Sequence, residues 1–251
     1  MSRVLSGFAL IVIFGACLWY LPTPALFAIA EIVLVAAFVE LASLFEQAGV
    51  AVPRTASGTV ACAMCAAIAW PGLRLEPVLI GGVLLLSIIA LAAGPGPATI
   101  PRFGAGLVPA LYLGLPLGSL VAVHRSFGRD AVLLLVATIV VSDTLQYYSG
   151  RLVGRHLLAS SISPKKTIEG AVGGLVGGVT AITVAGEWWM PTASVLTLAL
   201  VGGVLVAAGI AGDLFESLIK RSAGAKDSSR LIPGHGGVLD RIDALLFAAP
   251  V

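Results

Sequence analysis

One pattern recurs along almost the whole sequence: a long apolar stretch followed by a short polar break. A helix that crosses a bilayer needs about 20 mostly apolar residues. Soluble globular proteins contain about 25% charged residues, whereas this chain of 251 residues contains 11% charged and 58% hydrophobic residues. A compact water-soluble domain of this length cannot bury so much apolar surface, and a disordered or collagen-like chain is excluded as well. The sequence therefore predicts a membrane protein.

The expected fold is all-α: a polytopic membrane helical bundle with about eight or nine transmembrane helices. Spans are predicted at residues 4–21, 25–45, 57–70, 78–93, 104–123, 131–149, 169–188 and 193–219, with a short last helix at 238–249. We expect one membrane domain, with N-terminal helices in 1–130 and the polar motifs on the helices of 131–251. Gly170, Gly174 and Gly178 recur every four residues, which predicts close helix packing along one face.

The distribution of Lys and Arg predicts the orientation of the chain. With an inner N-terminus, the basic residues on the inner side are Arg3, Arg54, Arg102, Arg151, Arg155, Lys165, Lys166, Lys220, Arg221, Lys226 and Arg230. The outer loops contain Arg74, Arg125 and Arg129. This excess follows the positive-inside rule, and it places the polar loops 150–168 and 220–237 together on the cytoplasmic side.

Five carboxylates lie at the predicted cytoplasmic ends of the last spans. Asp213 and Glu216 are three residues apart, as are Asp240 and Asp243, and Asp143 lies near the end of the sixth span. Ionisable groups in membrane helices usually face a cavity or a partner. Oxygen ligands of this kind suit a hard cation such as Mg²⁺.

Basic and glycine residues accompany these carboxylates. Ser217 follows Asp213 by four residues and Lys220 follows Glu216 by four, so that one helix face contains a hydroxyl and an ammonium group as well. The glycine-rich run 233–237 precedes a predicted helix start, where backbone N–H groups favour an anion. Mg²⁺ together with Lys and Arg is the usual arrangement for binding polyphosphate. These residues predict phosphoryl or nucleotidyl transfer.

The motifs resemble those of a known family. They are SLIKR at 217–221, KD at 226–227, IPGHGGVLDRID at 232–243, GDLFE at 212–216, SDT at 142–144 followed by Tyr147, Gly150, Arg151 and Gly154, and SPKKTIEG at 163–170. Together they resemble the signature of the CDP-diacylglycerol synthase (phosphatidate cytidylyltransferase) family. Gln146 stands where that family has Ala. Residues 1–130 share only their membrane helices with the family.

The resemblance implies that CTP and phosphatidic acid react to CDP-diacylglycerol and pyrophosphate, with Mg²⁺ as cofactor. It implies metal ligands at Asp213 and Asp240, with contributions from Glu216 and Asp143. It implies that the phosphates are bound by Lys220, Arg221, Lys226 and Arg241. It also implies that Lys165 and Lys166 close over the nucleotide or the lipid head group. Substrate contacts are also expected at Ser217, His235, Gly236 and Gly237. For His235, a hydrogen bond to phosphate is favoured and a structural role in the turn stays open.

The orientation places a multi-pass protein in the cell (inner or plasma) membrane, with the active site facing the cytoplasm. The expected partners are CTP, phosphatidic acid and the bilayer; nucleic acid is not expected, and a homodimer and a second cation stay open.

Two other functions fit part of the pattern. An ion-coupled transporter also contains carboxylates in membrane helices, although nearer the bilayer centre. A CTP-dependent polyprenol or dolichol kinase would release CDP instead of pyrophosphate.

Overall fold

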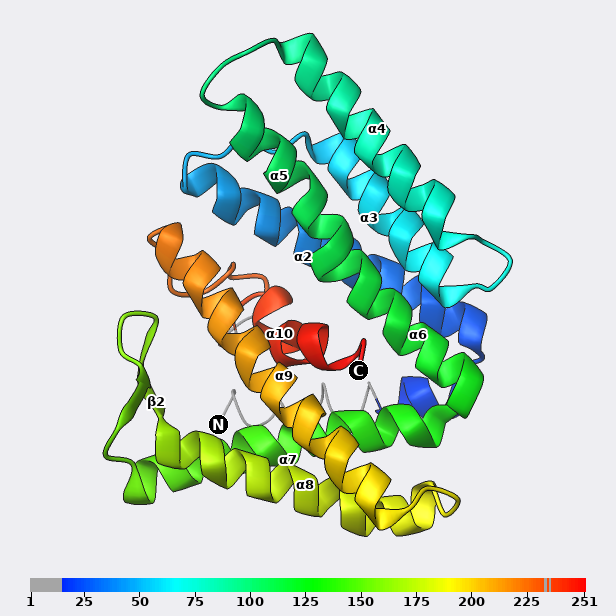
Figure 1. Cartoon of the computed structure of the whole chain (residues 1–251), viewed down its shortest axis with the longest axis vertical. Helices are drawn as coiled ribbons and strands as arrows, with labels where there is room; N and C mark the ends of the chain where they lie inside the picture. Colours follow the sequence, from blue (N-terminus) through cyan, green and yellow to red (C-terminus); the bar gives the residue numbers. More distant parts are fainter. Residues whose placement is uncertain (1–14, 233, 235) are drawn as a thin grey trace. The chain divides into compact units, whose positions relative to one another are not determined.

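The structure is a computed structural model that describes residues 15–232, 234 and 236–251 (Figure 1). Its helices are α2 (Thr23–Gln47), α3 (Arg54–Ala69), α4 (Leu75–Ala93), α5 (Thr99–Pro109), the π-helical turn η1 (Ala110–Gly114), α6 (Leu115–Phe127), α7 (Arg129–Val153), α8 (Ile168–Trp189), α9 (Val195–Ser222) and α10 (Leu239–Ala248). Within the described residues, the named strands form one antiparallel hairpin of β1 (Leu157–Ala159) and β2 (Ser163–Thr167).

The predicted all-α polytopic membrane fold is confirmed. In the described part of the chain, six helical stretches are long and apolar enough to cross a bilayer, namely α2, α4, the continuous α5–η1–α6 stretch, α7, α8 and α9. At 16 residues, α3 is shorter. Most of the first predicted span lies outside the described residues. Its described part is helical at residues 15–20. The total number of spans therefore stays a prediction. The hairpin at Leu157–Thr167 was not predicted from the sequence, which indicated only a polar loop there.

The described chain forms two compact units. Unit 1 contains the residues up to Arg125 together with Ile219–Ile242, and unit 2 contains Ser126–Leu218 together with Asp243–Val251. The predicted division into helices of 1–130 and of 131–251 stays a prediction.

In unit 1, α3 contacts α2, α4, α5 and η1. A Cβ atom added to Gly118 would lie 2.6 Å from the carbonyl oxygen of Cys65, and one added to Gly114 would collide with the carbonyl of Ala61. These two glycines and the small residues of α3 allow the two backbones to touch, which is a common means of helix association in lipid. The widened turn η1 forms where the N–H of Leu115 bonds the carbonyl of Ala110, immediately before a proline that has no N–H to donate.

In unit 2, α7 and α8 pack side by side and are joined by the hairpin (Figure 1). A Cβ atom on Gly170 would lie 2.8 Å from the carbonyl oxygen of Gln146, and one on Gly174 would lie 3.0 Å from that of Ser142. The predicted role of the four-residue glycine repeat in close packing is therefore confirmed. Along α9, Gly202 and Gly209 make similar approaches to neighbouring helices.

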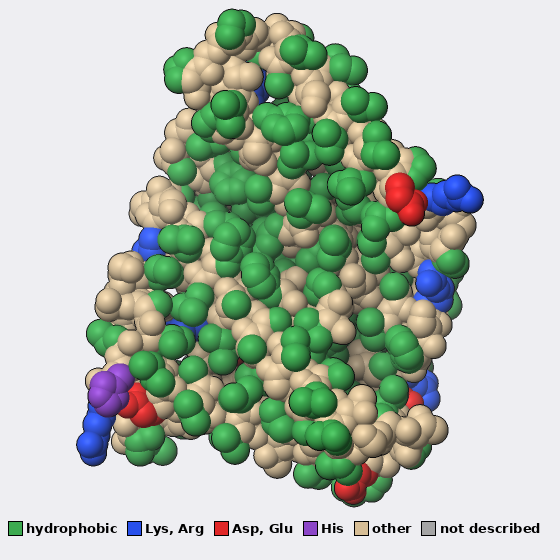
Figure 2. Space-filling model, viewed as in Figure 1, with side chains coloured by type: hydrophobic (Ala, Val, Ile, Leu, Met, Phe, Trp, Pro, Cys, Tyr) green, Lys and Arg blue, Asp and Glu red, His purple; other side chains and the backbone are tan. Residues whose placement is uncertain are grey.

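Large apolar side chains remain exposed on the outer faces of the helices (Figure 2). Examples are Ile80 and Ile88 on α4, Val176 on α8, and Leu196 and Leu200 on α9. A protein surrounded by water would bury such residues against its core or against a partner. Exposed apolar faces on helices of this length are the surface that lipid covers.

Substitution of Gly118 tests the contact between α3 and α6. In Gly118→Ala, the added methyl group lies 2.6 Å from the Cys65 oxygen and 2.8 Å from Ile68 Cβ, so that a helix must shift. Because overpacking costs about 1–3 kcal/mol, we expect a lower thermal unfolding midpoint for the purified protein in detergent. The control Gly203→Ala on α9 meets no atom within 4 Å and should keep or raise the midpoint, since Ala favours helices over Gly by about 1 kcal/mol. Equal midpoints for the two variants would contradict the described packing.

Candidate functional site

Asp240 is the centre of a buried polar cluster in unit 1. Its Oδ1 accepts a hydrogen bond from Lys220 Nζ at 2.6 Å. Its Oδ2 accepts three more: from Ser228 N at 2.9 Å, Ser228 Oγ at 2.8 Å and Gly237 N at 2.7 Å. The side chains of Lys220 and Asp240 are only 12% and 7% exposed. We call Lys220, Ser228, Gly237 and Asp240 the Asp240 cluster.

These donors determine the charge of Asp240. Burial by itself would raise its pKa, but hydrogen bonds from Lys220, Gly237 and Ser228 lower the pKa from 3.8 to about 2. Charged donors make the strongest hydrogen bonds to a carboxylate. Asp240 is therefore ionised at neutral pH even though its side chain is almost fully buried.

Two glycines make room for this cluster. Gly236 has a φ of 80°, a conformation that other residues rarely adopt, and a Cβ atom there would lie 2.5 Å from Asp240 Oδ2. A Cβ atom on Gly237 would collide with Ser228 Oγ and with the Glu40 carboxylate. The glycines predicted as a flexible, anion-binding turn thus also let the backbone approach two carboxylates closely.

The sequence analysis missed Ser228 of the Asp240 cluster and also Glu40 on α2. Glu40 is 5% exposed. Its carboxylate accepts hydrogen bonds from the hydroxyls of Ser228 and Ser229 and from the backbone N–H groups of Val238 and Leu239. A carboxylate in the middle of an apolar helix is costly and therefore indicates a partner or a function, and that signal was present in the sequence.

A second cluster lies in unit 2. Lys166 on β2 forms an ion pair with Asp213 on α9. Asp143 on α7 interacts electrostatically with both of these residues. Because side chains alternate along a strand, the neighbouring Lys165 points to the opposite face and is exposed. We call Asp143, Lys166 and Asp213 the Asp213 cluster.

The hairpin that contains Lys166 is anchored at its base. Glu169, in the first turn of α8, accepts hydrogen bonds from the backbone N–H groups of Arg155 and His156 and contacts His156 Nδ1 at 2.6 Å. Thr167 caps α8 by accepting the N–H of Gly170. These contacts position β2, and with it Lys166, relative to α8.

The remaining predicted residues differ in how far they are buried. Arg221, Lys226 and Arg241 are exposed, Ser217 is half-buried and Glu216 is fully buried. His235 lies outside the described residues. The predicted metal ligands Asp213 and Glu216 lie in unit 2 and Asp240 lies in unit 1, so their convergence on one ion stays a prediction. Among residues 15–232, 234 and 236–251, no three His, Cys, Asp or Glu side chains are grouped as a metal site.

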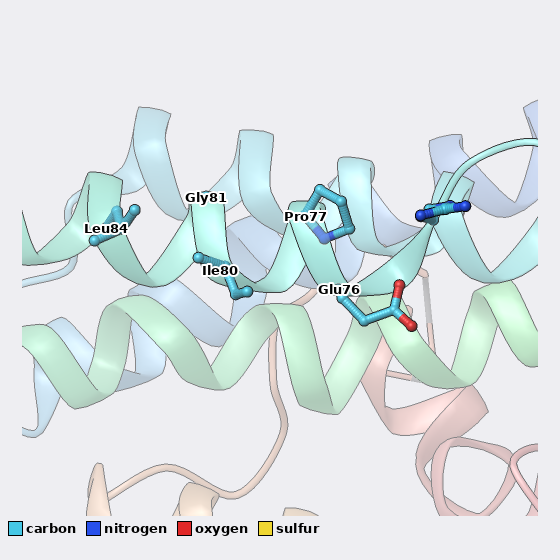
Figure 3. A pocket seen from close by; sticks show the side chains of 6 residues that line it. Glu76, Pro77, Ile80, Gly81 and Leu84 are labelled. Carbon is cyan, nitrogen blue, oxygen red and sulfur yellow. The ribbon is translucent and has the colours of Figure 1, made fainter.

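A groove of about 710 Å³ runs along the first half of α4 (Figure 3). It is lined by Arg74, Glu76, Pro77, Ile80, Gly81 and Leu84. Figure 3 shows Glu76 and Ile80 on the same side of the helix. None of the candidate residues lines this groove, which is therefore distinct from both clusters.

Comparison with known proteins identifies the family. A model of the cytidylyltransferase family matches residues 1–251. The chain belongs to the cytidylyltransferase family. This confirms the resemblance found in the motifs, and with it the prediction of a nucleotidyltransferase.

Three relatives of this chain have the name phosphatidate cytidylyltransferase. The chain is 31% identical over 255 residues to a phosphatidate cytidylyltransferase of Helicobacter pylori, a match that covers 99% of this chain and 88% of the relative. It is 42% identical over 157 residues to a phosphatidate cytidylyltransferase of Synechocystis, covering 60% of this chain and 53% of the relative. It is 48% identical over 126 residues to phosphatidate cytidylyltransferase 5, chloroplastic, of Arabidopsis thaliana, covering 49% and 31%.

Gly237→Ala tests the close packing around the glycine-rich turn. The added methyl group would collide with Ser228 Oγ and with both Glu40 oxygens, so the turn must move. We expect faster trypsin cleavage after Lys226 and a lower thermal midpoint, since overpacking costs about 1–3 kcal/mol. The control Gly104→Ala on α5 meets no atom within 4 Å and should leave cleavage unchanged. Unchanged cleavage in Gly237→Ala would show that the turn is not packed as described.

Proposed function

We propose that this cytidylyltransferase transfers the cytidylyl group of CTP to phosphatidic acid and forms CDP-diacylglycerol and pyrophosphate. The relatives named phosphatidate cytidylyltransferase support this activity, one of them over 99% of the chain. The observation that carries the proposal is the Asp240 cluster, in which residues from distant parts of the motif 217–243 form one hydrogen-bonded assembly. A protein embedded in the membrane also has direct access to a lipid substrate.

The chemistry requires positioning and charge neutralisation more than acid–base catalysis. A phosphate oxygen of phosphatidic acid attacks the α-phosphorus of CTP, a new P–O bond forms, and the bond to the bridging oxygen breaks as pyrophosphate leaves. The nucleophile is already an anion and pyrophosphate is a stable leaving group. The main barrier is therefore the repulsion between two negatively charged phosphates, which fixed positive groups lower.

The basic residues of both clusters suit this task. Asp240 holds the Lys220 ammonium in one position, so that this charge does not have to be ordered during the reaction. Arg221, Lys226 and Arg241 are exposed around the same segment of unit 1 and would bind phosphate oxygens. Lys166, held by Asp213, and the exposed Lys165 would bind the nucleotide or the lipid head group from unit 2.

We propose Mg²⁺ as the cofactor. The Asp213 cluster contains two carboxylates and one ammonium group, an excess of negative oxygen ligands that suits a hard cation. In this proposal Asp213 and Asp240 would be the direct ligands, with Asp143 and Glu216 as contributors. Bound Mg²⁺ would supply positive charge to the phosphates. Within this chain, Lys166 and Lys220 hold the carboxylates in defined positions.

We further propose that the protein lies in the cell membrane with both polar loops on the cytoplasmic side, where CTP is present. The excess of Lys and Arg in the predicted inner segments supports this orientation. A homodimer stays open.

Product analysis tests the proposed reaction. Purified full-length protein is incubated with labelled CTP, phosphatidic acid and Mg²⁺, and we expect labelled CDP-diacylglycerol together with pyrophosphate. Release of CDP with a phosphorylated lipid alcohol as the acceptor would identify a CTP-dependent lipid kinase instead. Cation-dependent uptake into vesicles without CTP turnover would identify a transporter.

Asp240→Asn tests the role of the Asp240 cluster. The amide keeps the shape of the side chain but loses the charge that orders Lys220, and we expect turnover to fall at least about a hundredfold. The protein should still insert into membranes and elute as a single species in detergent. Asp130→Asn, at an exposed position on α7, serves as the matched control and should retain wild-type turnover. Wild-type turnover in Asp240→Asn would overturn the assignment.

Removal of divalent cations tests the cofactor. Chelation with EDTA should abolish turnover, and added Mg²⁺ should restore it. Asp213→Asn should require a higher Mg²⁺ concentration for half-maximal turnover, because one ligand charge is lost. A Mg²⁺ dependence in Asp213→Asn identical to that of the wild type would remove Asp213 from the ligand set.

A further inference from the structure

The carboxylate of Glu40 belongs to none of the sequence motifs, yet it contacts the segment that contains them. It lies in the C-terminal half of α2, whereas all of its described hydrogen-bond partners lie between residues 228 and 239. We propose that Glu40 is a positioning residue that ties Ser228 and Ser229 to Val238 and Leu239 and thereby sets the geometry of Asp240 and Lys220. This inference rests on the proposed function for its catalytic consequence.

The pattern of contacts is that of a clamp on both ends of the loop. Glu40 Oε1 accepts a hydrogen bond from Ser229 Oγ at 2.6 Å and from Val238 N at 3.0 Å. Glu40 Oε2 accepts one from Ser228 Oγ at 2.9 Å and from Leu239 N at 2.8 Å. Each oxygen thus binds one hydroxyl from the start of the loop and one backbone N–H from its end.

A carboxylate is the side chain that these four donors require. An ionised carboxylate offers only acceptor sites, enough for all four hydrogen bonds, whereas an amide has one acceptor oxygen and would direct its own N–H groups at donors. Leu239 is the first residue of α10, and the first N–H groups of a helix have no partner within it. The negative charge of Glu40 at this helix N-terminus is also favoured by the helix dipole.

Ser228 connects this clamp to the Asp240 cluster. Its single hydroxyl proton is shared between Glu40 Oε2 and Asp240 Oδ2, which lie 2.9 and 2.8 Å from Oγ. Its backbone N–H donates to the same Asp240 oxygen. Gly237 lies against both carboxylates, with no room for a side chain. A displacement of Glu40 therefore moves Ser228 and the turn, and both of them hold Asp240.

The test compares Glu40→Gln and Glu40→Asp with the control Glu31→Gln in the full-length protein. Glu31 is on the same helix but interacts with Cys62 and Cys65 of α3. We expect Glu40→Gln to lower kcat per folded molecule at least about tenfold, the change that corresponds to 1.36 kcal/mol of activation free energy. Glu40→Asp, which keeps both oxygens, should recover most of this loss, and Glu31→Gln should match the wild type.

A double-mutant cycle with Ser228→Ala separates positioning from a general contribution to stability. If Glu40 acts through Ser228, the double variant Glu40→Gln/Ser228→Ala loses no more kcat than the worse single variant, because both changes break one connected unit. The proposal is overturned if the two losses multiply. It is equally overturned if Glu40→Gln only reduces the folded fraction while kcat per folded molecule stays at the wild-type value.

Amide hydrogen exchange provides a readout that does not depend on turnover. In Glu40→Gln, we expect the amides of Val238 and Leu239 to exchange at least about tenfold faster than in the wild type and in Glu31→Gln, because they lose their acceptor. Unchanged exchange would overturn the clamp. If the wild type converts no CTP and phosphatidic acid, the proposed function fails, and the exchange rates alone then decide whether Glu40 holds the loop.

Discussion

The buried carboxylate of Glu40 on α2 is the interaction on which the arrangement around the Asp240 cluster depends. A carboxylate inside an apolar helical body is tolerated only when donors replace the water that it has lost. Glu40 obtains four such donors from Ser228, Ser229, Val238 and Leu239. Because two donors come from residues 228–229 and two from residues 238–239, the requirement to solvate one charge also brings these two short stretches together. The hydrogen bonds that offset the desolvation of Glu40 are therefore the same ones that hold Ser228 beside Asp240.

The two clusters share a physical principle. In each of them a lysine is paired with an aspartate, Lys220 with Asp240 in unit 1 and Lys166 with Asp213 in unit 2. A lysine side chain is long and flexible, and ordering it costs conformational entropy. When a carboxylate holds the ammonium group before substrate arrives, this cost is met during folding. Such preorganised positive charge is the main means of stabilising the transition state of a reaction between two phosphate groups.

Some features follow from local properties of the chain and were predictable. The apolar stretches predicted the described helices to within a few residues, as for 169–188 against Ile168–Trp189. The glycine repeat predicted close packing along one face of α8, because side-chain size and helical period are both visible in a sequence; that the partner is α7 came from the structure. The pairing of Lys220 with Asp240 was not predictable, since 20 residues separate them. The hairpin was missed because SPKKT has no apolar alternation; hydrogen bonds between its two strands hold it in place.

The amino-acid sequence by itself determined the membrane-protein class, the helical fold and the family, and it predicted a set of charged candidate residues that did not include Glu40. Each of these depends on composition, on periodicity or on the spacing within one motif. The tertiary structure decided which charged groups meet. It brought Glu40 to Ser228 across 188 positions of the chain, and it placed the predicted metal ligands Asp213 and Asp240 in different units. The physical reason is that a hydrogen bond depends on distance in space, and only the packing of helices converts separation along the chain into that distance.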